Sequence, residues 1–235
     1  MTPPPLPSPL EGEGGVGGLK EKIEFMQLMT KEENERFCDL LASLLYPPDD
    51  ELVKEIRQGT LYSFFAKYID SVGGEKDTLK GFLKREGSEN LFEDLRDEYD
   101  RLFSILGQDS ISLAESFYKP WTTDPHCALP FASERGLLMG DSALHLLEVY
   151  HQCGLEASEE FKGCPDHLAM ELEFLSYLYR RATDVEIKMF IEDHLSWIPL
   201  LREELNRHHP HPFYVSALEV LTLFLNRERE RLEGR

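Results

Sequence analysis

The sequence predicts an all-α fold: a helical bundle of about 8–11 helices, built either as one body or as two lobes joined by a linker near residues 154–165. From Thr30 onward, apolar side chains recur at the three- and four-residue spacing that places them on one face of a helix. No alternating run of apolar and polar residues is bracketed by turn signals, so no strand is predicted. The chain has 235 residues, 41% hydrophobic and 29% charged, which suits a globular protein with a substantial core.

The first predicted helix begins at a capping box. Thr30 and Glu33 form the Thr-x-x-Glu pattern, in which each side chain bonds a backbone N–H of the first turn. Apolar residues follow at helical spacing until Pro47 and Pro48, which cannot continue a helix.

Two shorter helices follow, over 50–57 and 60–71, and glycines end both of them. Gly59 closes the first and the pair Gly73-Gly74 closes the second, because glycine adopts the left-handed conformation at a helix C-terminus without steric cost.

Three helices are predicted in the middle of the chain. One begins after Ser88, a second opens at Ser133 and closes at Gly154, and a third begins at Cys164-Pro165, where proline suits the first helical position. The Pro165 start would place Asp166 in the first turn, where a carboxylate interacts favourably with the helix dipole.

The last predicted helices are bounded by a second capping box and by prolines. Thr183 and Glu186 begin one helix, and Pro199 should kink or break it. The final helix runs from about Pro212. The histidines at 208, 209 and 211 fall between these helices, beside Pro210 and Pro212, and are read as part of a linker.

Two segments depart from the helical pattern. Residues 1–29 are rich in proline and glycine and are predicted to be a disordered tail and lead-in, so the folded helical domain is expected over 30–232. Residues 107–130 carry only a short helical stretch, around Ile111 to Phe117, followed by three prolines. Long irregular connections in compact domains are usually functional or disordered, and the aromatic residues here favour order.

Charge and composition exclude several classes of function. The net charge is −19, from 25 Lys+Arg and 44 Asp+Glu, which argues against a nucleic acid partner, since phosphate binding requires cations. No apolar run approaches the roughly 18 residues of a membrane span. The four cysteines are widely spaced and predict reduced thiols in a cytoplasmic protein, with no secretory signal ahead of them.

The stretch Asp166-His167-Leu-Ala-Met-Glu171 is the most informative for chemistry. His167 and Glu171 are four residues apart, so on a helix they share a face and can form a hydrogen bond. The plain structural interpretation is a helix cap and a surface pair. A sharper alternative is a metal-binding, di-iron-like enzyme that uses Glu148, His151, Glu171 and His167, although only one Glu-x-x-His is present.

The sequence contains no motif of nucleophilic catalysis or phosphate binding. It has no Gly-x-Ser-x-Gly, and no glycine-rich phosphate loop lies between a strand and a helix. We therefore expect a protein that is not an enzyme and that carries no cofactor.

Three stretches together resemble a known family. They are Glu115-Ser-Phe-Tyr118 with Pro120-Trp121, then Pro165-Asp166-His167-Leu-x-x-Glu171-Leu172, then His194-Leu-x-x-Trp197-x-Pro199 with Pro212-Phe213-Tyr214. In this order they resemble the TorD/DmsD/NarJ group of redox-enzyme maturation chaperones, and most closely the branch described as anaerobic dehydrogenase components.

This resemblance implies an all-helical cytoplasmic chaperone, monomeric or dimeric. Such chaperones bind the precursor of a molybdopterin-dependent oxidoreductase through its twin-arginine signal peptide and assist cofactor insertion before export. The positions that match the family motifs imply a peptide-binding surface made of Glu115, Tyr118, Trp121, Asp166, His167 and Glu171. Carboxylates are the natural partners of guanidinium groups, which they bind in bidentate geometry.

Overall fold

The computed structural model describes residues 29–83, 90–104, 110–158 and 161–234. Of the tail and lead-in predicted over residues 1–29, residues 1–28 lie outside these ranges. The elements in chain order are α2 (Lys31–Ser43), α3 (Asp50–Gln58), α4 (Thr60–Ser71), the 3₁₀ helix η1 (Lys76–Phe82), α5 (Leu91–Phe103), α6 (Glu115–Tyr118), α7 (Asp141–Gln152), α8 (Leu168–Arg181), α9 (Asp184–His194), α10 (Ile198–Arg207) and α11 (Pro212–Glu233).

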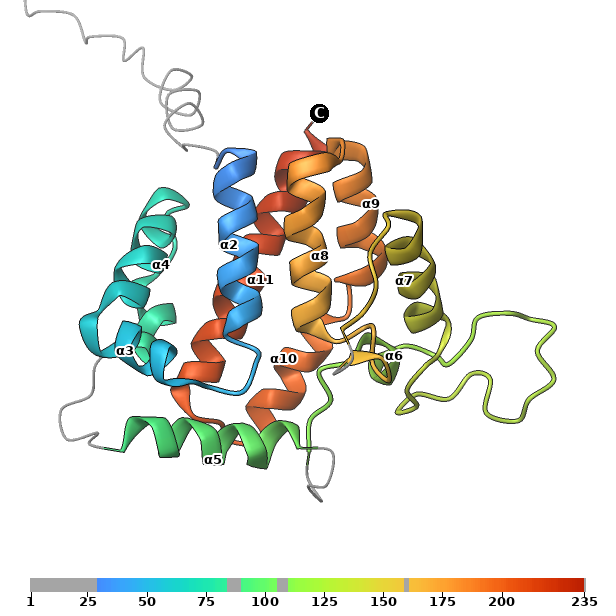
Figure 1. Ribbon diagram of the computed structural model, residues 1–235, viewed down its shortest axis with the longest axis horizontal. Helices are drawn as coiled ribbons and strands as arrows, with labels where there is room; N and C mark the ends of the chain where they lie inside the picture. Colours follow the sequence, from blue (N-terminus) through green and yellow to red (C-terminus); the bar gives the residue numbers. More distant parts are fainter. Residues whose placement is uncertain (1–28, 84–89, 105–109, 159–160, 235) are drawn as a thin grey trace, which may run out of the picture.

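The helices form one bundle around a continuous core. Helices α2 and α8 lie side by side at its centre, and the long helix α11 passes behind them and packs on η1, α9 and α10 (Figure 1). One contiguous set of buried apolar side chains reaches from Phe37 in α2 to Leu232 in α11. The core therefore continues across the predicted linker at 154–165, and the described helices form one body, not two lobes.

The all-α prediction is confirmed. Within the described ranges, β structure is limited to an isolated antiparallel bridge between Ala114 and His167. None of the described helices is long and apolar enough to cross a lipid bilayer.

Both capping boxes form as the sequence predicts. The Thr30 N–H donates to the Glu33 carboxylate at 2.7 Å, and the Glu33 N–H donates to Thr30 Oγ1 at 3.2 Å. Thr183 and Glu186 repeat this arrangement at the start of α9. Gly59 takes the left-handed conformation, with φ of 72°, at the end of α3.

The helix predicted to open at Ser133 begins later, at Asp141, so that prediction was wrong. Two residues before it have positive φ, Gly136 at 82° and Met139 at 59°, which no helix tolerates. Gly140 then lies directly against Trp121, where a Cβ atom would come within 2.5 Å of the Trp121 carbonyl oxygen. The segment is held by this contact with an earlier loop, which periodicity does not reveal.

The helix predicted to begin at Cys164-Pro165 begins at Leu168 instead. His167 is its N-cap, and its Nδ1 accepts the Ala169 N–H at 3.2 Å. The preceding residues are held away from helical geometry by the bridge to Ala114. Asp166 therefore lies before the helix and not in its first turn, which corrects the sequence interpretation.

The irregular connection after α6 is ordered by backbone pairing. Helix α6 covers only Glu115–Tyr118, less than the predicted stretch from Ile111. Beyond it, the Trp121 N–H donates to the Glu134 carbonyl at 2.9 Å and the Thr122 N–H to the Ala132 carbonyl at 2.8 Å. The loop between them projects from the bundle beside α7 (Figure 1).

Candidate functional site: a buried carboxyl cluster

Two backbone hydrogen bonds fasten the segment before α6 to the start of α8. The Glu115 N–H donates to the Asp166 carbonyl at 3.0 Å, and the Leu168 N–H donates to the Leu113 carbonyl at 2.8 Å. The Asp166 carboxylate adds a third bond, since its Oδ2 accepts the Ser116 N–H at 2.6 Å. This pairing brings together residues about fifty positions apart in the sequence.

Three carboxyl groups are fully buried at this junction. Glu115, Asp166 and Glu171 each have 0% of their surface exposed. Glu171 comes from the first turn of α8, and the end of α9 supplies His194 beside it. One side-chain ligand atom from each of Glu115, Glu171 and His194 lies within 4.8 Å of the other two. Acidic residues are rarely buried without partners, so each of these carboxyls needs an account.

Glu115 is held by a histidine that connects it to the surface. His194 Nδ1 lies 2.8 Å from Glu115 Oε2, and the other ring nitrogen, Nε2, lies 2.8 Å from Nδ1 of His145. The two imidazole rings stack with their centroids 4.9 Å apart. His145 is exposed on α7. A hydrogen-bonded chain therefore runs from solvent through two imidazoles to the buried carboxyls.

The surroundings of Glu171 favour its neutral form in the folded protein. Burial raises the pKa of Glu171 well above its usual range, and the charges of Glu115 and Asp166 and a hydrogen bond with Glu115 raise it further. Trp197 Nε1 donates to Glu171 Oε2 at 3.2 Å, while Oε1 of Glu115 and Oε1 of Glu171 have no amide, hydroxyl or ring donor. A proton held between the two carboxyls would give one of these oxygens a donor.

Lys119 stands at the boundary between the cluster and solvent. Its Nζ lies 2.5 Å from Glu115 Oε1, a close charge contact without the angles of a hydrogen bond, and donates to the Asp193 carbonyl. The Lys119 side chain is 30% exposed, whereas the Glu115 side chain is 0% exposed. The Lys119 ammonium thus contacts the buried Glu115 carboxylate from the solvent side.

Two other predicted site residues, Tyr118 and Trp121, have different surroundings. Tyr118 is buried, stacks on Trp197 with ring centroids 5.1 Å apart, and donates its hydroxyl to the Ser112 carbonyl at 3.0 Å. Trp121 is partly exposed on the loop and meets Phe131 edge to face, with centroids 5.1 Å apart.

His167 lies beside the cluster but does not bond Glu171 through its side chain. Its ring packs on Phe161, with centroids 4.7 Å apart, and burial lowers the pKa of His167 to about 4. The predicted His167–Glu171 side-chain bond does not form, because His167 precedes the helix and uses its Nδ1 as the cap. The structure brings Glu115, Asp166 and Glu171 together as buried carboxyls, which the sequence could not show, whereas Trp121 makes its contacts on the loop.

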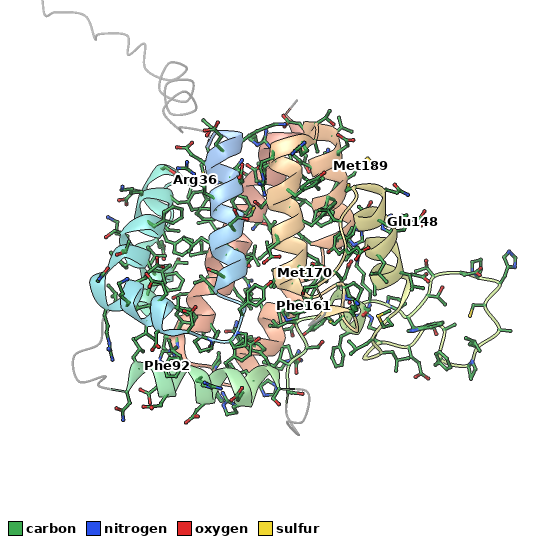
Figure 2. All side chains as sticks on the ribbon, viewed as in Figure 1. Arg36, Phe92, Glu148, Phe161, Met170 and Met189 are labelled. Carbon is green, nitrogen blue, oxygen red and sulfur yellow. The ribbon has the colours of Figure 1, made fainter. Side chains whose placement is uncertain are left out.

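The ligand set of the metal-enzyme alternative does not assemble. Glu148, labelled in Figure 2, is exposed on α7, as is His151. Glu148 accepts a hydrogen bond from Gln152 at 3.1 Å. Within the ranges that the structure describes, the one group of three or more residues that could hold a metal ion is Glu115, Glu171 and His194. His151 and Glu148 belong to no such group, so this alternative is not favoured.

Four residues of the site were not predicted as site residues: His145, Lys119, His194 and Trp197. The pair His194 and Trp197 had a signal, since it lies in the third family-like stretch, at the helix break before Pro199. His145 and Lys119 had none, because their contacts depend on how α7 and α6 pack.

Comparisons with known proteins found a matching family model and related sequences. The family model described as nitrate reductase delta subunit matches residues 67–211. A TorD chaperone protein from Vibrio atlanticus (strain LGP32) is 30% identical over 222 residues, covering 86% of this chain and 99% of the relative. A TorD chaperone protein from Vibrio parahaemolyticus is 25% identical over 220 residues, with the same coverage of both chains.

A solved structure described as a redox enzyme maturation protein, from Archaeoglobus fulgidus, aligns with a TM-score of 0.47 and 22% identity over 88% of this chain and 96% of the other. The family model spans more than half of the chain, and the TorD relatives span nearly their whole length. The chain belongs to the nitrate reductase delta subunit family of TorD-like redox-enzyme maturation chaperones.

Proposed function

We propose that the protein is a cytoplasmic chaperone that binds the precursor of a molybdopterin-dependent oxidoreductase through its twin-arginine signal peptide and assists cofactor insertion before export. The observation that carries this proposal is the full-length similarity to proteins named TorD chaperones. The buried carboxyl cluster gives that similarity a chemical basis, because it concentrates the groups that a pair of arginines requires.

The charge of the chain suits a basic peptide. A net charge of −19 attracts cationic segments over long range and accelerates their encounter with the protein. Long-range attraction does not by itself select arginine, so selection must come from short-range contacts. The Glu115 carboxylate, which already binds one cation in Lys119, is a group that could make such short-range contacts with arginine.

The segment after Glu115 carries exposed apolar side chains that suit the hydrophobic part of a leader peptide. Phe117, Trp121 and Phe131 are partly exposed, and Leu129 and Leu138 are exposed on the same loop. Exposed aromatic and aliphatic side chains next to charged groups are typical of peptide-binding surfaces. Tyr118, buried against Trp197, would position this surface without itself contacting the peptide.

The buried carboxyls support the site from within, on this proposal. Asp166 holds the start of α6 in place through the Ser116 N–H, and so it fixes both Glu115 and the loop that follows. His167 fixes the start of α8 as its N-cap. These contacts support a role for Asp166 and His167 in orienting the proposed peptide-binding groups.

Calorimetry with synthetic peptides tests the proposal. The full chain should bind a peptide that has an Arg-Arg pair followed by an apolar stretch, and should bind a Lys-Lys version at least about tenfold more weakly, since lysine cannot form bidentate pairs. Asp166→Ala and His167→Ala should weaken binding while far-UV circular dichroism stays unchanged. Equal binding of both peptides, or no binding of either, would contradict the proposal.

We propose no catalytic role for the cluster. Its groups are engaged with one another: His194 bridges Glu115 and His145, and Trp197 bonds Glu171. The relatives are named for chaperone activity, and a binding role accounts for a cluster of buried carboxyls.

A further inference from the structure

The ion pair between Lys119 and Glu115 is unusual, because the ammonium reaches a buried carboxylate from the solvent side, as a bound ligand would. Most lysine–glutamate pairs at i,i+4 lie on the surface with both side chains in water, as Lys188 and Glu192 do in α9. In the Lys119 pair the carboxylate is fully buried, while the ammonium comes in from the solvent side and is anchored on the Asp193 carbonyl.

The cluster has more capacity for donors than Lys119 uses. Oε1 of Glu115 and Oε1 of Glu171 are buried and receive no amide, hydroxyl or ring donor. A buried acceptor without a donor costs free energy, and such atoms in a native structure require an explanation. A guanidinium offers five N–H donors in one plane and could serve both oxygens at once, which an ammonium on a short tether cannot do.

We infer that Lys119 is a built-in substitute for an arginine of the client peptide: the arginine displaces the Lys119 ammonium from Glu115, bridges Glu115 and Glu171, and expels the proton that the two carboxyls share. This inference rests on the proposed function and names the subsite, the displaced group and the ion released. Charge is conserved, because a cation enters, Lys119 returns to solvent as a cation, and one proton leaves.

The structure provides a route for that proton. The imidazoles of His194 and His145 link Glu115 to solvent through contacts of 2.8 Å each. Ionisable groups near the two glutamates come from each neighbouring element. They are Lys119 beside α6, His145 and Tyr150 on α7, Cys164, Asp166 and His167 before α8, and His194 on α9. Tyr150 and Cys164 stay neutral, since burial raises the pKa of Cys164 to about 12 and that of Tyr150 further. This inference assigns the released proton to the two carboxyls, and the Glu171→Gln variant tests that assignment.

Variants of Lys119 give opposite expectations for affinity. Lys119→Gln removes the competing cation, so the Arg-Arg peptide should bind at least about fivefold more tightly. Lys119→Arg leaves a better competitor in place, so the same peptide should bind about threefold or more weakly. Lys188→Gln is the matched control: it changes the net charge equally and also breaks an i,i+4 pair, and its side chain has a similar exposed fraction of 34%. It should leave affinity within twofold of the wild type.

Calorimetry in two buffers of different ionisation enthalpy measures the proton. Binding of the Arg-Arg peptide to the wild-type chain at pH 7 should release about one proton, and binding to Glu171→Gln, whose amide carries no such proton, should release none. Wild-type binding with no proton released, or Lys119→Gln binding no tighter than Lys188→Gln, would overturn the inference while leaving the proposed function intact. No binding of the peptide by wild-type protein would instead contradict the proposed function. Lys119→Arg keeps the buried charge paired, so its result stands even where Lys119→Gln unfolds.

Discussion

His194 Nδ1 lies 2.8 Å from Glu115 Oε2, although 79 positions separate these residues in the sequence. The contact joins the last turn of α9 to the first residue of α6, and both side chains are buried. Because the other nitrogen of His194 bonds the exposed His145, this one pair connects the interior of the carboxyl cluster to solvent. The stability and the binding properties of the protein should therefore both depend on pH through this cluster.

Replacing Glu171 by glutamine should stabilise the protein above neutral pH. The raised pKa of Glu171 means that the unfolded chain ionises this group near its ordinary pKa of about 4.3, while the folded protein keeps the proton. The stability that the proton provides is complete below that pH and is lost as pH rises through the folded pKa. Glutamine stays neutral, so Glu171→Gln should exceed wild type by at least about 1 kcal/mol at pH 8 and by little at pH 4.

Urea unfolding of wild type and Glu171→Gln between pH 4 and 8 measures this difference. Comparison at each pH cancels the contributions of all other titrating groups. A difference that does not grow with pH would show that Glu171 is ionised in the folded protein.

Replacing His167 by asparagine should protect the protein against acid. Burial lowers the pKa of His167 to about 4, below its ordinary value of about 6.5. Its contribution to stability is present above the unfolded pKa and is lost as pH falls toward the folded value. Asparagine is also a good N-cap and retains an acceptor for the Ala169 N–H. His167→Asn should therefore lose less stability than wild type between pH 7 and pH 4.

Thermal denaturation followed by circular dichroism across this range is the appropriate measurement. If both proteins lost the same stability, the His167 ring would not be the buried neutral group that the structure indicates.

Replacing Gly140 by alanine should disrupt the loop beside the site. A Cβ atom at Gly140 would lie 2.5 Å from the Trp121 carbonyl oxygen, which accepts the Asp141 N–H at 2.8 Å. Relieving this contact would require the backbone to move, so we expect the free energy of unfolding to fall by about 1–3 kcal/mol. Gly163→Ala is the control, because a Cβ there meets nothing within 4 Å. Equal unfolding midpoints for the two variants in urea would contradict the packing of Trp121 against the start of α7.

Local signals in the sequence predicted most of the helices, and long-range contacts account for what was missed. Thr30 and Thr183 each open a helix because the cap and its partner are three residues apart, which the sequence displays directly. The helix start expected at Ser133 failed because Gly140 packs against Trp121, a contact across the loop. The start expected at Pro165 failed because Ala114 pairs with His167, a contact between distant segments.

The residues of the candidate site also fall into those that the sequence could identify and those that depend on long-range packing. Glu115, Asp166 and Glu171 could be selected from the sequence because they lie in family-like stretches, but their complete burial could not, since carboxylates are ordinarily exposed. Lys119 and His145 carry no sequence signal, because their roles follow from the packing of α6 and α7 around the carboxyls.

The most direct test of chaperone function is capture of the client from cells. The full chain, carrying an affinity tag and expressed in its own organism under anaerobic growth, should be isolated together with one large molybdopterin oxidoreductase, and peptide mass spectrometry should find the Arg-Arg leader still attached. Charge-reversed Glu115→Lys should lose this partner, whereas Glu192→Lys, an equal change of charge on the exposed side of α9, should retain it. Recovery of only the mature enzyme without its leader, or of the same partner with Glu115→Lys, would contradict the account.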